Sequence, residues 1–392
     1  MQFKLNFYAL LPFLTLLQAL IFSSLLIYRG ATKERRSDYW LALVLMLSAI
    51  SDVPYMLGWM GINYLWTTLT FYPWDGWDFA LPPALYFFFL HLTNQNYRFR
   101  KRDWFHFLPY AIYFTYHLIV AIQGQAYAEW WWRNIDDQWH IYRFFQVVKV
   151  VQQTGYFYLT LKLYRSYRAW IEQQFSDIER VSFKWFVNAL YVFASFVVAT
   201  WLYSITDLLN HYDYETMWWV YLFDTVFVYY LSIAGYNQPL ITSLYFRDTS
   251  QMPAPQTFDA PETEMPKSVL VDTELTEWKS KIAAFMDNDS PYLQSGLTLS
   301  EMATRLHTNN TLLSSVINDG FGKNFNDFVN EYRVELFKKR IEDGAFRHLT
   351  LLAVAYECGF NSKATFNRAF KKLVGKAPKE FIDETINNKT II

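Results

Sequence analysis

The chain has 392 residues, and its 35 Lys and Arg against 36 Asp and Glu give a formal net charge of −1. Hydrophobic residues make up 53% of it and charged residues only 18%, against roughly 25% charged in an ordinary soluble domain. This composition excludes a disordered chain and a collagen-like fibre, and a single cysteine, Cys358, excludes a disulfide scaffold. It also argues against one ordinary water-soluble globule.

The first 246 residues contain seven apolar segments, each of which predicts a membrane-spanning helix. Spanning a bilayer takes about 20 mostly apolar residues in a helix, because no water is present to pair the backbone polar groups. Pro82 and Pro83 interrupt the start of the third segment, which makes it the weakest. The alternative is a set of core helices in a large soluble protein, and the scarcity of charges inside seven consecutive segments disfavours it. The segments are Phe7–Tyr28, Tyr39–Trp59, Phe79–Thr93, Phe105–Ile122, Phe144–Tyr164, Trp185–Tyr203 and Trp218–Tyr236.

The basic residues of the connecting loops predict the orientation of these segments. Lys and Arg gather after the first, third and fifth segments, whereas the alternate loops are nearly free of them. The positive-inside rule therefore places the N-terminus outside and the C-terminus in the cytoplasm. With seven spans the two ends fall on opposite sides, as this orientation requires. We expect residues 1–246 to be a seven-helix transmembrane sensor domain with the lipid bilayer as its partner.

Three ionisable residues lie inside the predicted spans: Asp52, Lys149 and Asp224. Charged groups at membrane depth are costly and mostly face a cavity or a partner. In the predicted topology all three lie at a similar depth from the outer side. They predict either a ligand pocket for a small polar or charged signal molecule, or a buried ion pair that only fixes helix packing. Both alternatives are open at this point.

Residues 247–272 differ sharply from what precedes them. Their sequence is RDTSQMPAPQTFDAPETEMPKSVLVD from Arg247, with four prolines, scattered acids and no apolar periodicity. Such a stretch cannot bury a core. It predicts a flexible, proline-rich linker that tethers residues 273–392.

Helical periodicity returns after the linker, beginning with an apolar stripe at 3–4–3 spacing. The stripe predicts an amphipathic helix. It either packs on its own domain or pairs with a second copy in a homodimer. Its residues are Leu275, Trp278, Ile282 and Phe285.

Two similar units of short helices follow, at about 300–320 and 350–372. In the first, Thr298–Glu301 begins a helix and Asn309 caps the next, as in a helix-turn-helix. A long helix near Asn326–Glu342 joins the units. In the second, Cys358-Gly359-Phe360 forms the turn, and Asn361 or Ser362 caps the last helix. That helix has a basic outward face, with no acid from residue 361 to 379, which suits contact with DNA phosphates and bases.

The stretch from Leu297 to Phe381 resembles the DNA-binding domain of the AraC/XylS family of bacterial transcription regulators. The resemblance is carried by LTLSEMATRL, by LLSSVINDGFGKNFNDFVNEYRVE and by LTLLAVAYECGFNSKATFNRAFKKLVGKAPKEF. It implies two helix-turn-helix units that contact successive major-groove faces of promoter DNA. His307 stands where the family usually has Gly, and Ser315 where many members carry Arg. With the basic face, it predicts DNA contacts from Asn310, Thr311, Ser314, Ser315, Lys363, Ala364, Thr365, Asn367, Arg368, Lys371 and Lys372.

The order of a multi-helix membrane part, a linker and this domain also resembles membrane-anchored members of that family. The sequence thus predicts an all-α, multi-pass regulator of the bacterial cytoplasmic membrane, whose signal is an unknown ligand or protein. We find no phosphate-binding loop, catalytic triad or metal-ligand spacing, and so expect no enzyme and no cofactor. The alternative is a membrane transporter or receptor with a regulatory helix-turn-helix appendage.

Overall fold

The computed structural model describes residues 7–62, 73–179, 181–210, 218–238, 246, 272–344 and 349–390. It divides the chain into two compact units, and each is described by itself. Within the described ranges the chain is helical and contains no strand beyond one isolated bridge, so the all-α prediction is confirmed. The predicted linker 247–272 lies outside the described residues, apart from Asp272.

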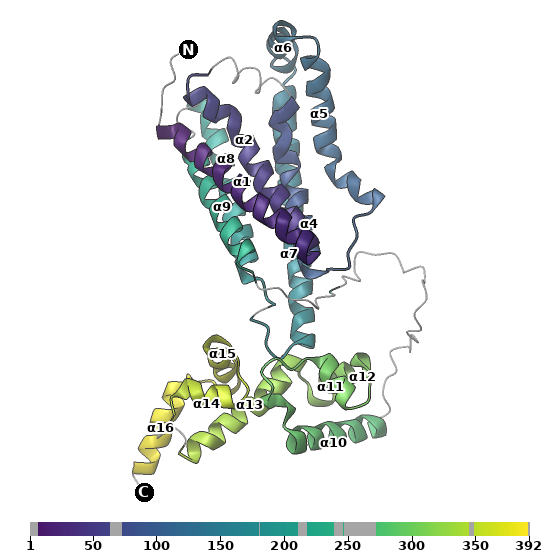
Figure 1. The fold of residues 1–392 in the computed structure, drawn as a ribbon, viewed down its shortest axis with the longest axis vertical. Coiled ribbons are helices and arrows are strands. Elements are labelled where there is room, and N and C mark those ends of the chain that lie inside the picture. The colour runs from purple at the N-terminus through teal and green to yellow at the C-terminus, as the bar shows by residue number, and fades with distance from the viewer. Residues whose placement is uncertain are drawn as a thin grey trace. The chain divides into compact units, whose positions relative to one another are not determined.

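Unit 1 comprises Met1–Arg165 and Lys184–Asp248. Helices occupy each of the seven predicted segments, as Figure 1 shows. They are α1 (Phe7–Lys33), α2 (Arg36–Trp59), α4 (Leu81–Thr93), α5 (Leu108–Ala121), α7 (Ile141–Gln174), α8 (Lys184–Asn210) and α9 (Trp218–Tyr236). Shorter elements are η1 (Pro73–Phe79), η2 (Lys101–Phe107), α6 (Gln125–Trp131) and the π-helical η3 (Trp132–Asp136).

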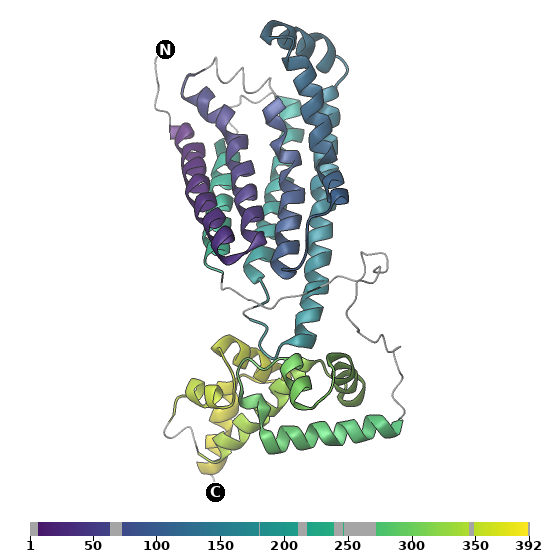
Figure 2. The same ribbon diagram turned by 45° about the vertical axis from the view of Figure 1, so that its right-hand side comes forward.

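Helix α2 lies at the centre of one part of unit 1, where it packs against α1, α4 and α9. Its Leu41, Val44 and Leu45 are fully buried. Arg29 of α1 ties three of these helices together, because its Nε lies 2.6 Å from Asp38 of α2 and its guanidinium also donates to the carbonyl of Tyr236 in α9. Figure 2 shows the helices of this unit side by side.

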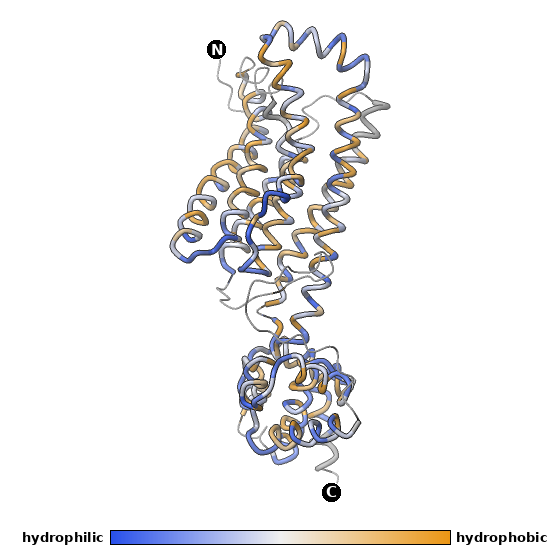
Figure 3. Tube along the Cα trace, turned by 90° about the vertical axis from the view of Figure 1, so that its right-hand side faces the viewer, coloured by the Kyte–Doolittle hydropathy of each residue, from blue (hydrophilic) through white to orange (hydrophobic). Residues whose placement is uncertain are grey.

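Two of the helices, α1 and α2, are long and apolar enough by length and composition to cross a membrane. The pair Lys101–Ala121 and Gln125–Asp136 also qualifies if it counts as one span, but it is bent by 118°. The described residues therefore contain two or three candidate spans, fewer than the seven predicted. Helix α4 is too short, with 13 residues, and α7 carries several charges. Figure 3 shows hydrophobic stretches along the helices of this unit.

Unit 2 comprises Ser166–Phe183 and Thr249–Ile392, and so includes the end of α7 and the loop after it. The predicted domain 1–246 therefore differs from the observed unit by this inserted segment. The remaining helices of unit 2 are α10 (Asp272–Asp289), η6 (Pro291–Leu293), α11 (Leu299–Arg305), α12 (Asn310–Ser315), η7 (Val316–Gly320), α13 (Phe325–Glu342), α14 (Leu351–Glu357), α15 (Lys363–Val374) and α16 (Pro378–Thr390).

Helix α13 contributes to both hydrophobic cores of unit 2. Phe325, Phe328 and Val329 from its first half belong to the core that α10, α11 and α12 complete. Phe337 and Ile341 from its second half belong to the core under α14, α15 and α16. The two groups of short helices are thus joined through one continuous helix.

The apolar stripe of α10 packs on its own unit. Ile282 is fully buried in the first core, and Leu275, Trp278 and Phe285 are partly buried against it. The stripe therefore attaches α10 to the short helices that follow it, as in the first of the two predicted alternatives. The homodimer through these four residues stays a prediction.

Candidate nucleic-acid interface

The first helical pair of unit 2 is fixed by hydrogen bonds at its helix starts. Thr298 and Glu301 form a capping box at α11, with the Thr298 backbone amide donating to Glu301 Oε2 at 2.9 Å. His307 adopts the left-handed conformation with φ +55°, which confirms that this position needs the backbone expected of glycine. Asn309 then caps α12, its Oδ1 accepting from the Leu312 amide at 2.8 Å.

The second pair repeats this arrangement. Thr350 caps α14, and Gly359 makes the turn with φ +91°. Of the two candidate caps of α15, the structure shows Ser362, whose Oγ accepts from the Thr365 amide at 3.1 Å. The start of α15 favours a negatively charged partner, because the first backbone amides of a helix have no acceptor within it.

Helix α15 separates an apolar face from a basic one. Phe366, Ala369 and Phe370 lie in the second core. Lys363, Ala364, Asn367 and Lys371 are exposed on the other side. In α12, Asn310 and Thr311 are exposed, whereas Ser314 and Ser315 are half-buried and contact Asn318 and Asp319. The second helix of each pair, α12 or α15, therefore exposes polar residues.

Comparison with known proteins agrees with this geometry. The model of a family described as a helix-turn-helix domain matches residues 302–384. Residues 302–384 form a helix-turn-helix domain.

Two relatives are similar to parts of the chain. An uncharacterized HTH-type transcriptional regulator, YtdP, of Bacillus subtilis (strain 168) is 32% identical over 88 residues. This match covers 22% of the chain and 11% of that relative, so the chain spans about a tenth of the relative's length. A solved structure of a protein of unknown function from Listeria innocua has 23% identity and a TM-score of 0.24, over 27% of this chain and 94% of that one.

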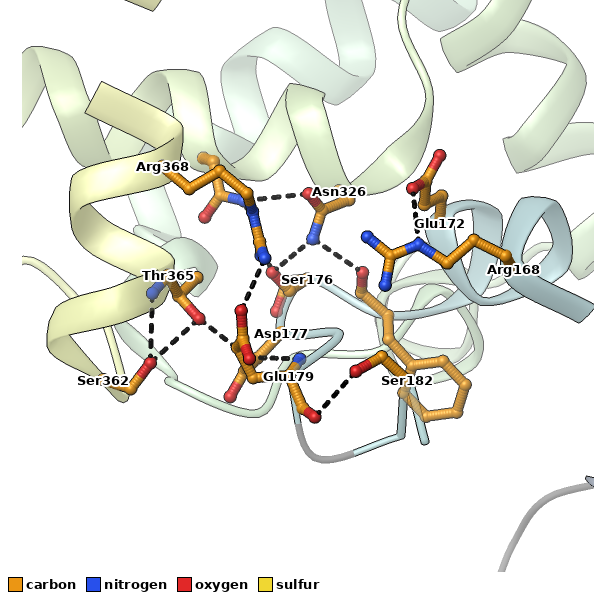
Figure 4. Close-up of polar contacts among 12 residues, drawn as sticks. Arg168, Glu172, Ser176, Asp177, Glu179, Ser182, Asn326, Ser362, Thr365 and Arg368 are labelled. Atoms are coloured by element: carbon orange, nitrogen blue, oxygen red, sulfur yellow. Dashed lines mark hydrogen bonds and ion pairs between the residues drawn. The ribbon is translucent and has the colours of Figure 1, made fainter. Parts of the chain in front are cut away.

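Three residues of α15 that were predicted to contact DNA are also engaged within the chain. Thr365 is only 1% exposed, and its Oγ1 donates to Asp177 at 3.2 Å, so its hydroxyl is not free for a base. Arg368 forms an ion pair with Glu179 at 2.5 Å. Lys372 Nζ lies 2.6 Å from the carboxylate of Asp327 in α13. Figure 4 shows the first two contacts.

The acidic residues Asp177 and Glu179 were not predicted as part of this site. They precede their partners in the helix-turn-helix domain by 184 to 189 positions. The sequence around Asp177 and Glu179 does not indicate which distant residues they contact. These contacts are therefore seen only in the three-dimensional structure.

Arg333 of α13 is a second unpredicted residue, fully buried beneath the interface. Its guanidinium donates to the carbonyls of Tyr292 at 2.7 Å and Gln294 at 2.8 Å, and to Ser176 Oγ at 3.3 Å. Burial lowers the pKa of Arg333 to about 10, opposed by the nearby Asp177 carboxylate, so the side chain remains charged at neutral pH. It holds η6 and the Ser176 region against α13.

The candidate ligand pocket in unit 1 is only partly assembled as predicted. Asp52 of α2 and Asp224 of α9 lie close enough for their carboxyl groups to interact. Lys149 instead pairs with Asp78 of η1, Nζ to Oδ2, at 3.2 Å. Asp78 was not predicted, because it lies directly before the predicted span Phe79–Thr93 and not inside it. Among the described residues no group of His, Cys, Asp and Glu has the geometry of a metal site.

Proposed function

We propose that this chain is a membrane-embedded one-component transcription regulator, in which unit 1 receives a signal and the helix-turn-helix domain binds promoter DNA in the cytoplasm. The observation that carries the proposal is the exposed face of α15, with Lys363, Asn367 and Lys371 on a helix of a helix-turn-helix domain. Lysines attract phosphates, and an exposed amide can pair with an adenine edge in the major groove.

Substitutions on this face test DNA binding. Asn367→Ala is expected to cost about 1–3 kcal/mol of affinity for a bound promoter and to relax the preference at one base position. Lys371→Ala is expected to weaken binding to all sequences and to lower the salt slope by about one. The matched control is Lys376→Ala, because Lys376 is an exposed lysine just beyond α15 that pairs with Glu384. Equal affinity of all three variants and the wild-type chain would refute the proposed interface.

Membrane embedding is supported by apolar side chains on the outside of unit 1. Helix α1 exposes a row of large apolar residues, including Leu10, Phe13 and Leu17, each between 44% and 45% exposed. Helices α5, α7, α8 and α9 also expose large apolar side chains, among them Ile119, Val151, Val198 and Val226. In water such surfaces drive association, whereas lipid tails cover them without cost.

The proposed topology has seven spans, with the N-terminus outside. A reporter fused after Ile392 and active only in the cytoplasm tests it, and a reporter active only outside, fused at the same place, is the control. Activity of the outside reporter alone would place the helix-turn-helix domain on the wrong side of the membrane and refute the proposed regulator.

The acidic pair Asp52–Asp224 and the neighbouring ion pair Lys149–Asp78 are our candidates for receiving the signal. Asp52 is buried, whereas the Lys149 and Asp78 side chains are partly exposed. Ionisable groups inside a membrane are costly, and a small ligand or a shift between helices can change their interactions. The test measures transcription from bound promoters with Asp52→Asn, Lys149→Met and Asp224→Asn, each inserted at wild-type level, under conditions that change wild-type output. Unchanged responses in all three variants would reject a signalling role.

A further inference from the structure

We propose that the loop segment Phe175–Glu179, between α7 and α8, is an internal competitor of DNA for the second recognition helix, α15. The proposal rests on the DNA-binding function proposed above. In the chain this segment lies between helices of unit 1, yet in space it belongs to unit 2. Three of its five residues, Ser176, Asp177 and Ile178, are buried.

The backbone of the segment occupies a site that fits an extended peptide. Ser176 donates its amide to the Leu297 carbonyl at 3.1 Å, beside an antiparallel bridge between Phe175 and Thr298. The Ser176 carbonyl accepts from the Asn326 amide at 2.7 Å and from the Asn330 amide at 3.4 Å. Asn326 and Asn330 are buried side chains of α13. The segment supplies the carbonyl acceptors of the Asn326 amide and a second acceptor for the Asn330 amide, which also donates to Asn326 Oδ1 at 3.2 Å.

The side chains of the segment engage the start of α15, as Figure 4 shows. Asp177 accepts from Asn361 Nδ2 at 2.6 Å and from Thr365 Oγ1 at 3.2 Å. Glu179 pairs with Arg368, and the loop that carries it is folded back by a bond from Ser182 Oγ to the Glu179 carbonyl at 3.1 Å. Two carboxylates thus lie on the flank of the helix that presents Lys363, Asn367 and Lys371.

These carboxylates oppose DNA in two ways. One of them, Glu179, holds the guanidinium of Arg368, a group suited to contacts with bases or phosphates. They also place negative charge beside the path of the phosphate backbone, where like charges repel. The ion pair itself is half-exposed and contributes little stability. DNA can therefore displace Glu179 from Arg368, and the bound segment lowers the affinity of the domain for DNA.

The position of the segment between α7 and α8 allows a signal to regulate this competition. Residues 165 and 184, which flank the inserted segment, both belong to unit 1. A signal that changes the positions of the ends of α7 and α8 acts directly on the segment between them. Release of the segment would free Arg368 and remove two charges from the flank of α15 in one step.

Affinity of the full chain for DNA tests the proposal. The chain is placed in lipid nanodiscs with a duplex of random sequence as the probe, because phosphate contacts dominate such binding. Glu179→Gln is expected to bind about 5-fold tighter than wild type or more, and Asp177→Asn combined with it tighter still, with the gain shrinking as salt rises. Both changes remove the charge and keep the shape of the side chain and one acceptor oxygen. Glu172→Gln is the matched control, since Glu172 pairs with Arg168 on α7 and is expected to leave affinity unchanged.

A second measurement follows the segment itself. In the wild-type chain, hydrogen exchange at Phe175–Glu179 is expected to increase when the duplex is added at saturation, because the Ser176 amide loses its acceptor. Unchanged exchange with DNA bound would overturn the competition, as would equal affinity of wild type and Glu179→Gln. Absence of DNA binding by wild type and every variant would overturn the proposed function, and the inference with it.

Discussion

Substitution of Gly359 by alanine, in the turn of the second helix-turn-helix unit, tests how closely that unit packs against η6. The φ of +91° at Gly359 costs a residue with a Cβ about 1–2 kcal/mol. A Cβ at this position would also overlap the Tyr292 carbonyl oxygen and lie 2.9 Å from the Leu293 Cα. Those are backbone atoms of η6, so η6 must move.

Movement of η6 has a further cost, because the Tyr292 carbonyl accepts from the buried Arg333 Nε at 2.7 Å. Weakening a buried hydrogen bond to a charged group adds about 1.5–3 kcal/mol. Gly359→Ala is therefore expected to destabilise the domain by about 2.5–5 kcal/mol in total. Gly375→Ala is the matched control, since Gly375 has φ +80° and nothing within 4 Å of an added Cβ. It should cost only about 1–2 kcal/mol.

Pulse proteolysis in urea, with a tag after Ile392 and the full chain in detergent, measures both variants. A difference of about 2 kcal/mol separates the two midpoints by roughly 0.7–2 M at ordinary m-values. A Gly359→Ala midpoint equal to that of Gly375→Ala would refute the argument, because only the backbone conformation would then matter.

Three further predictions concern the same domain. Asn309→Ala removes the cap of α12 and should lower the unfolding free energy by about 1 kcal/mol in the same urea assay. Arg333→Met leaves the Tyr292 and Gln294 carbonyls without their donor and should cost at least about 2 kcal/mol, whereas a loss below that of Asn309→Ala would contradict its role. Burial raises the pKa of the Cys358 thiol from 9.0 to about 11, so its contribution to stability is complete below pH 9 and is lost as pH rises from 9 to 11. Unfolding free energy should fall more steeply in that range for wild type than for Cys358→Ala, and iodoacetamide should label Cys358 at pH 8 only after unfolding, as mass spectrometry can show.

Local features of the domain could be predicted from the sequence because each depends on neighbouring residues. The caps at Asn309 and Thr298, the glycine turn at Gly359 and the left-handed His307 each follow from one side chain or one backbone angle. The basic outward face of α15 could likewise be predicted, because helical periodicity assigns residues to faces and no acid occurs from residue 361 to 379. These predictions are confirmed by the geometry.

Contacts between distant parts of the chain could not be predicted in this way. The pairing of Glu179 with Arg368 joins residues 189 positions apart, and that of Lys149 with Asp78 joins residues 71 apart. Charge patterns indicate only that such groups need partners, and several partners of opposite sign were available. The stripe of α10 had two physically reasonable partners, its own core and a second copy, and the sequence could not choose between them.

Because α13 contributes to both hydrophobic cores, the two helices proposed to face DNA, α12 and α15, are both attached to one continuous helix. If both helices bind DNA as proposed, an operator for this chain must present its two recognition sequences at one fixed separation and one fixed angle. Inserting a single base pair between them would rotate the second sequence by about 34–36° around the duplex. Because α13 is one continuous helix, α12 and α15 cannot rotate relative to each other to restore both contacts.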